Sequence, residues 1–297
     1  MPFPTDRNTI LQTFAKLNIW KRRGERAPHK PLLILLALSF VQNHKERLVT
    51  WQAIKKPLRA LLREYGSPRT QIHPEFPFWY LQNDGVWEVD KFDILTQVKK
   101  FDQPSSKDLL TYNAKAGFRQ EIFDCLISDP MLITDIANLL LEGHFPSSIH
   151  DDILNSIGLQ RLYVMKRKRD PKFSRGVIQA YSHRCAICGY DLKLDNVDLA
   201  LEAAHIRWHS AGGPDEISNG LALCSIHHKA LDRGALTLSD EHIIRISGQI
   251  HGGEHSKDWF LRFNNVRIND PHSKKFLPAQ EFLLWHRQEV FREPAIE

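Results

Sequence analysis

The spacing of apolar positions predicts mainly helices in the first half of the chain. Between Asp6 and Arg22 apolar residues recur on one helical face, at Ile10, Leu11, Phe14 and Leu17. The nearly continuous apolar run at Leu32–Asn43 predicts a buried helix, and Leu58–Tyr65 predicts a further one. From Lys107 to Leu159 the pattern is mostly helical again.

A stretch rich in proline and aromatic residues interrupts these helices. Asn83-Asp84-Gly85 has the composition of a tight turn between Phe78–Leu81 and Val86–Val89. We therefore predict a short β-hairpin here. Its aromatic side chains are expected in the core, at Phe76, Phe78, Trp79 and Trp87.

The composition changes sharply at the basic segment around residue 165, "MKRKRDPKFSRG". This change predicts a first domain over residues 1–160, a basic linker over 161–172 and a second domain over 173–297. In the second domain, Asp198–Ile206 alternates like a strand, and Ile226–Asp232 reads as a helix. The expected fold class is α+β, with a mostly helical first domain.

Overall composition indicates an ordinary globular protein of 297 residues, 42% hydrophobic and 25% charged. The longest apolar run, Leu32–Val41, is shorter than the roughly 20 residues that span a bilayer. The N-terminal "MPFPTDRNT" lacks a secretory signal pattern. We expect a cytoplasmic, bacterial-type protein without membrane contact.

The net charge of +5 is concentrated in two zones. Arg7–Lys30 and Lys166–Arg184 each hold seven Lys/Arg residues and one acidic residue. Such zones are typical of nucleic-acid-binding proteins, although either zone alone could be a solvated basic face.

Two cysteine-containing pairs suggest a metal site. Cys185 and Cys188 form one pair, Cys224 and His227 the other, each with two intervening residues. Two such pairs can complete a tetrahedron around a structural Zn²⁺. A redox role would need a βαβ pattern near the C-x-x-C motif, and none is present. Cys125 stands apart and reads as a buried apolar residue.

Around these pairs the sequence resembles that of the HNH endonucleases with a ββα-metal finger. "EAAHI", "NGLALC" and "HHKALDRG" carry the resemblance over about residues 175–245. It implies that His205 is the general base for phosphodiester hydrolysis and that Asn219 holds the loop and orients His205. It also implies that His228 binds a catalytic divalent cation, Mg²⁺ or Mn²⁺.

One position departs from the usual HNH pattern. Many of these enzymes carry a second metal ligand just before the base, where this chain has Ala204. Glu202 and Asp232 are the candidate replacements, with Asp232 favoured because positions i and i+4 meet on a helix. A salt bridge is an equal alternative for Asp232. His209 is expected to be a solvated loop histidine.

The first half resembles the sulfur-binding domain of McrA-like type IV restriction endonucleases. "RAPHKPLLILLAL" and "HPEFPFWYLQNDGVWEV" carry this resemblance, which covers roughly residues 5–160. It implies binding of phosphorothioated double-stranded DNA ahead of an HNH domain. The residues expected to contact the DNA or its sulfur are Arg22, Arg26, Ala27, Pro28, His29, Lys30, His73, Pro74 and Pro77.

Sulfur is larger and less strongly hydrated than the phosphate oxygen it replaces, so an apolar pocket accepts it. The same pocket would strip water from an ordinary oxygen at a cost of about 1–3 kcal/mol.

Two alternatives stay open: a nuclease that reads another mark, such as a methylated base, and a zinc-stabilised DNA-binding protein without catalysis. Cleavage of both strands by one site per chain favours a homodimer.

Overall fold

The computed structural model describes residues 6–19, 28–68, 71–99, 102–159 and 171–297. The chain divides into two compact units, unit 1 (Met1–Met165) and unit 2 (Lys166–Glu297). The division falls within the segment assigned above to a linker, and the domain bounds themselves stay a prediction. Among the described residues, no helix is both long and apolar enough to cross a membrane.

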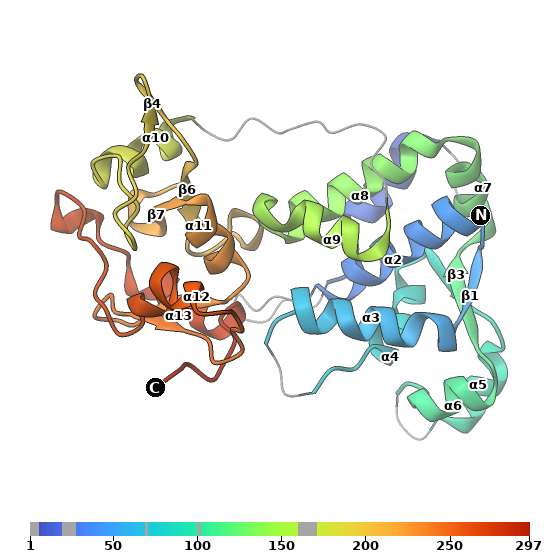
Figure 1. Cartoon of the computed structure of the whole chain (residues 1–297). Coiled ribbons are helices and arrows are strands. Elements are labelled where there is room, and N and C mark those ends of the chain that lie inside the picture. The colour runs from blue at the N-terminus through green and yellow to red at the C-terminus, as the bar shows by residue number, and fades with distance from the viewer. Residues whose placement is uncertain (1–5, 20–27, 69–70, 100–101, 160–170) are drawn as a thin grey trace. The chain divides into compact units, whose positions relative to one another are not determined.

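Unit 1 consists mainly of helices, with a small antiparallel sheet at one side of its described part (Figure 1). Its elements are α1 (Arg7–Ala15), α2 (His29–His44), β1 (Leu48–Thr50), α3 (Trp51–Tyr65), α4 (Glu75–Tyr80), η1 (Leu81–Asp84), β2 (Trp87–Val89), α5 (Phe92–Val98), α6 (Ser106–Thr111), β3 (Lys115–Phe118), α7 (Gln120–Ser128), α8 (Pro130–His144), η2 (Ser147–Ile149) and α9 (His150–Ile157).

Helix α2 is the centre of unit 1. Its residues from Pro31 to Ser39 are all buried, and α3, α4, α7, α8 and α9 pack around it. Pro28 and Pro31 lie at its start, where a missing N–H costs no intrahelical hydrogen bond. A helix that is apolar on every side must be surrounded, so the prediction of a buried helix is confirmed.

The predicted hairpin at residues 78–89 is wrong. Phe78–Leu81 belongs to α4 and η1, and Gly85, at φ 74°, ends η1 in the left-handed conformation. Strand β2 pairs instead with β3, which β1 flanks on its other side. The buried residues of this segment recur at helical spacing, which favours a helix over a strand. They are Pro74, Pro77, Phe78 and Leu81.

Two predicted helix boundaries also need correction. Helix α1 ends at Ala15 rather than Arg22. Beyond it, Asn18 donates its N–H to Asp84 and accepts a hydrogen bond from Lys30, so tertiary contacts replace helical ones. Helix α3 begins at Trp51 rather than Leu58, because the Thr50 side chain caps it and the exposed Pro57 is accommodated within it.

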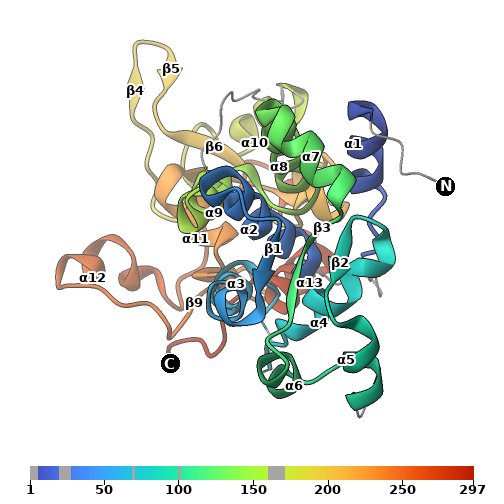
Figure 2. The same ribbon diagram turned by 90° about the vertical axis from the view of Figure 1, so that its right-hand side faces the viewer.

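Unit 2 confirms the α+β class and the strand–loop–strand–helix order of a ββα finger. Its elements are α10 (Pro171–Ala180), β4 (Lys193–Leu194), β5 (Val197–Asp198), β6 (Leu201–His205), η3 (His209–Ala211), η4 (Ile217–Asn219), β7 (Gly220–Cys224), α11 (Ser225–Asp232), β8 (Leu236–Leu238), β9 (Ile244–Ile246), α12 (His255–Trp259), η5 (Leu261–Phe263), η6 (Lys274–Phe276) and α13 (Gln280–Glu289). Figure 2 shows the β4–β5 ribbon and the α12 segment extending from the rest of unit 2.

Gly117 in the middle strand of the unit 1 sheet gives a stability prediction. A Cβ at this position would lie 1.6 Å from the backbone carbonyl oxygen of Arg47. Gly117→Ala should therefore lower the free energy of unfolding by about 2 kcal/mol or more, because backbone must move. Urea unfolding of the full chain measures it. Gly143→Ala in α8, where nothing lies within 4 Å, is the matched control and should be neutral or slightly stabilising. Equal stability of the two variants would contradict the prediction.

Candidate functional site

The β6–β7 hairpin and α11 bring the HNH residues together in unit 2. The strands pair in antiparallel register, with Leu201 opposite Cys224 and His205 opposite Gly220. Helix α11 starts directly after Cys224 and packs against both strands. Helix α10 also packs on the hairpin, and Gly220 allows this close approach, because a Cβ there would meet Val177 at 2.4 Å.

Three cysteines and one histidine converge at the end of the hairpin where α11 begins. One ligand atom from each of Cys185, Cys188, Cys224 and His227 lies within 4.8 Å of the others. The His227 Nδ1 atom is 3.2 Å from the Cys224 sulfur and 3.6 Å from the Cys185 sulfur. Gly189, at φ 74°, closes the turn that places the first two sulfurs. Sulfur and imidazole donors in a tetrahedral set could hold a zinc ion.

The electrostatics of this cluster also fit a bound cation. Burial lowers the pKa of His227, but the Cys185 and Cys224 sulfurs outweigh it and raise that pKa to about 9. Hydrogen bonds with neighbouring sulfurs lower the pKa of Cys185 and raise that of Cys188. The buried Nε2 of His227 has no hydrogen-bond partner among the described residues, and its ring stacks on Phe260. Nδ1 is therefore the nitrogen that faces the sulfurs, and a cation would replace the protons shared there.

Asn219 holds the loop that joins the two strands. Its buried side chain accepts a hydrogen bond from the N–H of Arg207 at 2.8 Å. Its amide donates to the carbonyls of Arg207 at 3.0 Å and Pro214 at 2.9 Å. These three bonds close the loop immediately after His205.

His205 lies between an aromatic ring and a carboxylate. Its ring stacks on Phe173 of α10, with centroids 3.9 Å apart and an interplanar angle of 15°. Its Nε2 is 2.7 Å from Asp215 Oδ1, and the His209 ring lies 6.1 Å away in an edge-on arrangement. The sequence showed Asp215 only as part of the turn "GGPDE", so its contact with His205 was missed.

His228 is buried between the two carboxylates proposed as alternatives. Its Nδ1 lies 2.5 Å from Glu202 Oε2, and its Nε2 lies 3.2 Å from Asp232 Oδ2. Burial lowers the pKa of His228, but Asp232 and Glu202 outweigh it and raise that pKa to about 9. Asp232 is buried like His228, whereas the Glu202 side chain is 44% exposed. The two carboxylates therefore engage opposite nitrogens of one imidazole.

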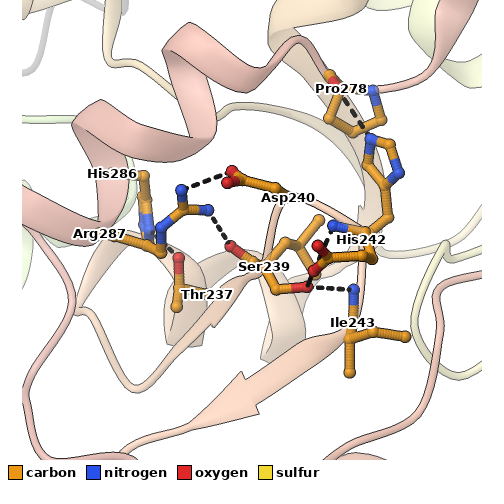
Figure 3. Close-up of polar contacts among 10 residues, drawn as sticks. Thr237, Ser239, Asp240, His242, Ile243, Pro278, His286 and Arg287 are labelled. Carbon is orange, nitrogen blue, oxygen red and sulfur yellow. Dashed lines mark hydrogen bonds and ion pairs between the residues drawn. The ribbon is translucent and has the colours of Figure 1, made fainter.

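Helix α13 supports the end of α11 through a fully buried histidine. His286 Nε2 donates to the carbonyl of Leu231 at 3.0 Å, and its Nδ1 accepts from the Thr237 hydroxyl at 2.8 Å. Figure 3 shows the bond between His286 and Thr237 beside Arg287, which donates to the carbonyl of Leu238 and pairs with Asp240. Because Leu231 precedes Asp232, His286 fixes the turn that carries this carboxylate. The sequence pattern gave no sign of this role of His286.

In unit 1 the two stretches proposed for DNA contact lie on packed elements. Helix α2 packs against α4. Lys30 at the start of α2 forms an ion pair with Asp84 and donates to the carbonyl of Asn18. In the free protein the Lys30 amine thus connects the start of α2 to Asn18 and to Asp84. Arg22, Arg26 and Ala27 lie outside the described residues.

The prolines of these stretches face the interior, and other side chains form the surface. Pro28, Pro74 and Pro77 are buried, whereas His29 and His73 are partly exposed. His73 stacks on Phe76 with centroids 4.7 Å apart, and its Nδ1 is 2.9 Å from Glu75. The expectation that Phe76 lies in the core is wrong, because it is 38% exposed; Phe78, Trp79 and Trp87 are buried as expected.

Comparison with known proteins assigns a family to each half. The ScoMcrA-like DNA sulfur-binding domain matches residues 7–162, and the HNH endonuclease family matches residues 185–239. Together these domains define a modification-dependent DNA endonuclease. By its first and larger match, the chain belongs to the ScoMcrA-like DNA sulfur-binding domain family.

Solved structures similar to this chain include sulfur-binding domains. The ScoMcrA domain complexed with phosphorothioated DNA is 23% identical, with a TM-score of 0.43, over 50% of this chain and 94% of that one. The SprMcrA domain complexed with phosphorothioated DNA is 17% identical, with a TM-score of 0.42, over 52% and 94%. The type IV phosphorothioation-dependent restriction endonuclease ScoMcrA is 22% identical, with a TM-score of 0.40. That alignment covers 54% of this chain but only 31% of ScoMcrA. No curated protein matches.

The four-donor cluster gives a prediction on metal content. The full chain should carry about one tightly bound metal ion, and Cys188→Ser should lose it because the tetrahedral set is broken. His227→Ala should lose the ion and lower the melting temperature, since metal binding contributes directly to folding. His228→Ala, its neighbour, is the control and should keep the ion. Elemental analysis and thermal melting measure these outcomes. Equal metal content of the two histidine variants would refute the assignment of His227 and His228 to different centres.

Proposed function

We propose that this chain is a type IV restriction endonuclease that binds phosphorothioated double-stranded DNA and cuts it nearby. The observation that carries the proposal is the joint presence of a DNA sulfur-binding domain and an HNH domain. The positions of His205, Asn219 and His228 are compatible with catalysis. A DNA-binding protein without catalysis needs none of these three side chains. The described relatives in complex with phosphorothioated DNA supply the ligand class.

The sulfur would be selected by the surface around the start of α2 and of α4. His29, His73 and Phe76 are the more exposed side chains of these two segments, whereas Pro28, Pro74 and Pro77 are buried. Weakly hydrated sulfur loses little on contact with this apolar surface. An ordinary phosphate oxygen would lose water without gaining a hydrogen bond, at a cost of about 1–3 kcal/mol. Ala27 is proposed to form part of the apolar surface that accepts the sulfur. Arg22, Arg26 and Lys30 are proposed to contact the remaining phosphate oxygens and flanking nucleotides.

His205 is proposed to accept the proton of the attacking water. Asp215 next to Nε2 favours the tautomer with the hydrogen on that nitrogen, which leaves the lone pair on Nδ1. Stacking on Phe173 fixes the ring plane, and Asn219 fixes the loop behind it. Nδ1 of His205 is then the general base, and Asp215 is a positioning residue.

His228 and Asp232 are proposed to hold the catalytic cation, Mg²⁺ or Mn²⁺. His228 Nε2 and Asp232 Oδ2 lie 3.2 Å apart, so both atoms could hold one cation. Glu202 then accepts the Nδ1 hydrogen and orients the imidazole. When bound, the cation would offset the negative charge that develops on the phosphate.

The structural ion is proposed to be Zn²⁺, held by Cys185, Cys188, Cys224 and His227. Its S₃N donor set suits zinc, which demands no redox chemistry. Because one chain contributes one HNH site, cleavage of both strands favours a homodimer on DNA. A cytoplasmic location follows from the same proposal, since the substrate is cellular DNA.

Cleavage of matched duplexes tests the proposed function. With Mg²⁺ or Mn²⁺, the full chain should cut a phosphorothioated duplex and leave the unmodified and methylated duplexes intact. His205→Ala should bind the phosphorothioated duplex normally but cut it at least about 100-fold more slowly, because the general base is lost. Gel electrophoresis of products and equilibrium binding measure the two effects. Cutting of the methylated duplex would indicate another mark, and binding without any cutting by the unaltered chain would indicate a non-catalytic protein.

Two isosteric variants distinguish the roles of the carboxylates beside His228. Asp232→Asn should raise the Mn²⁺ concentration for half-maximal cleavage by at least about tenfold, since it removes a charged ligand. Glu202→Gln should have a smaller effect, because the amide oxygen still accepts the Nδ1 hydrogen. Metal titration of the cleavage rate, with zinc content as the control for folding, measures both. The reverse order of effects would transfer the ligand role to Glu202.

A further inference from the structure

Helix α3 of unit 1 carries a row of cations with no assigned role. Its buried face packs into the domain through Trp51, Ile54, Leu58, Leu61, Leu62 and Tyr65. Its other side is exposed to solvent along the outside of unit 1 (Figure 1). The exposed cations are Lys56, Arg59 and Arg63, with the half-buried Lys55 beside them.

These cations occupy one flank of the exposed side. At about 100° per residue, Lys55, Arg59, Arg63 and Lys56 fall within an arc of about 100°. The other exposed flank is formed by Ala53, Pro57, Ala60 and Glu64, which carry a single acidic group. The helix surface is thus divided into apolar, cationic and nearly neutral strips. Amphipathic packing explains the apolar strip only.

The cations of this strip are not used within the protein. Among the residues that the structure describes, none of Lys55, Lys56, Arg59 and Arg63 has a hydrogen bond or an ion pair. Two partly buried cations of unit 1 are engaged instead, Arg7 with Asp129 and Arg47 with Glu88. Four neighbouring cations without a counter-charge repel one another, so a polyanion would stabilise this strip.

We infer that the cationic strip of α3 is a second DNA-contacting surface, which binds the phosphate backbone regardless of sulfur. This inference rests on the proposed function. Lys56 and Arg63 are about 10 Å apart along the axis, which matches about three successive phosphates of one strand. Contacts of this kind add affinity and position the duplex, and they carry no information on the mark. The strip therefore contributes to binding of any duplex, and the surface near α2 and α4 discriminates.

The triple variant Lys56→Gln/Arg59→Gln/Arg63→Gln tests this inference in the full chain. Equilibrium binding is measured without added divalent cation, at several salt concentrations, for a phosphorothioated and an unmodified duplex. Binding to both should weaken by the same factor, at least about tenfold, and the slope of log K against log salt should fall by about 2 to 3. The single variant Arg59→Gln should lower the slope by about 0.9.

The matched control removes the same charge elsewhere on unit 1. Lys45→Gln/Lys91→Gln/Lys107→Gln changes three exposed lysines outside α3 and should leave binding close to that of the unaltered chain. Lys56→Arg/Arg59→Lys/Arg63→Lys should restore affinity and slope, which excludes a folding defect.

Equal affinities of the triple variant and its control would overturn the inference, as would a loss confined to the phosphorothioated duplex. An unaltered chain that binds both duplexes equally would instead contradict the proposed function. In that case a parallel loss on both duplexes would still support the role of α3.

Discussion

The convergence of three sulfurs and one imidazole is the constraint on which unit 2 depends. Its strands have two to five residues, too few to hold a catalytic arrangement alone. The cluster joins the turn at Cys185 and Cys188 to the junction of β7 and α11. The N–H of Ala186 also donates to the carbonyl of Ala222 in β7. The turn is therefore held to the hairpin both by this hydrogen bond and by the metal cluster. Because α11 starts at this junction, the cluster sets the direction in which α11 runs.

The adjacent His227 and His228 then serve different centres. Side chains one position apart on a helix point about 100° apart, so they cannot both meet one small ion. His227 faces the sulfurs and the ring of Phe260, whereas His228 faces Glu202 on β6 and Asp232 one turn later. A shift of the helix by one residue would exchange the two surroundings. The cluster and the His286 contact at the other end of α11 prevent such a shift.

Short-range patterns predicted the parts of the site whose donors are close in sequence. The two pairs with two intervening residues were sufficient for the metal cluster, β6 followed from alternation, and α11 followed from helical spacing. Contacts between distant segments left no such signal. The bond from His286 to Leu231, the pairing of Lys30 with Asp84 and the contact of Asp215 with His205 are of this type. The hairpin prediction failed because a turn-like Asn-Asp-Gly also ends a helix, where Gly85 supplies the left-handed residue.

Under the proposed function, the two units divide affinity, discrimination and chemistry between them. Backbone contacts from a cationic strip act on every duplex, so they raise sulfur-specific and unspecific binding equally. Discrimination is a difference of affinities, and it must come from a surface where an oxygen loses hydration that sulfur does not need. An HNH site that reads no bases adds nothing to that difference. If the cationic strip bound DNA too tightly, most of the bound protein would occupy unmodified DNA. A strip of only three to four cations, screened over about 8 Å at physiological salt, keeps that binding weak enough for the sulfur to decide.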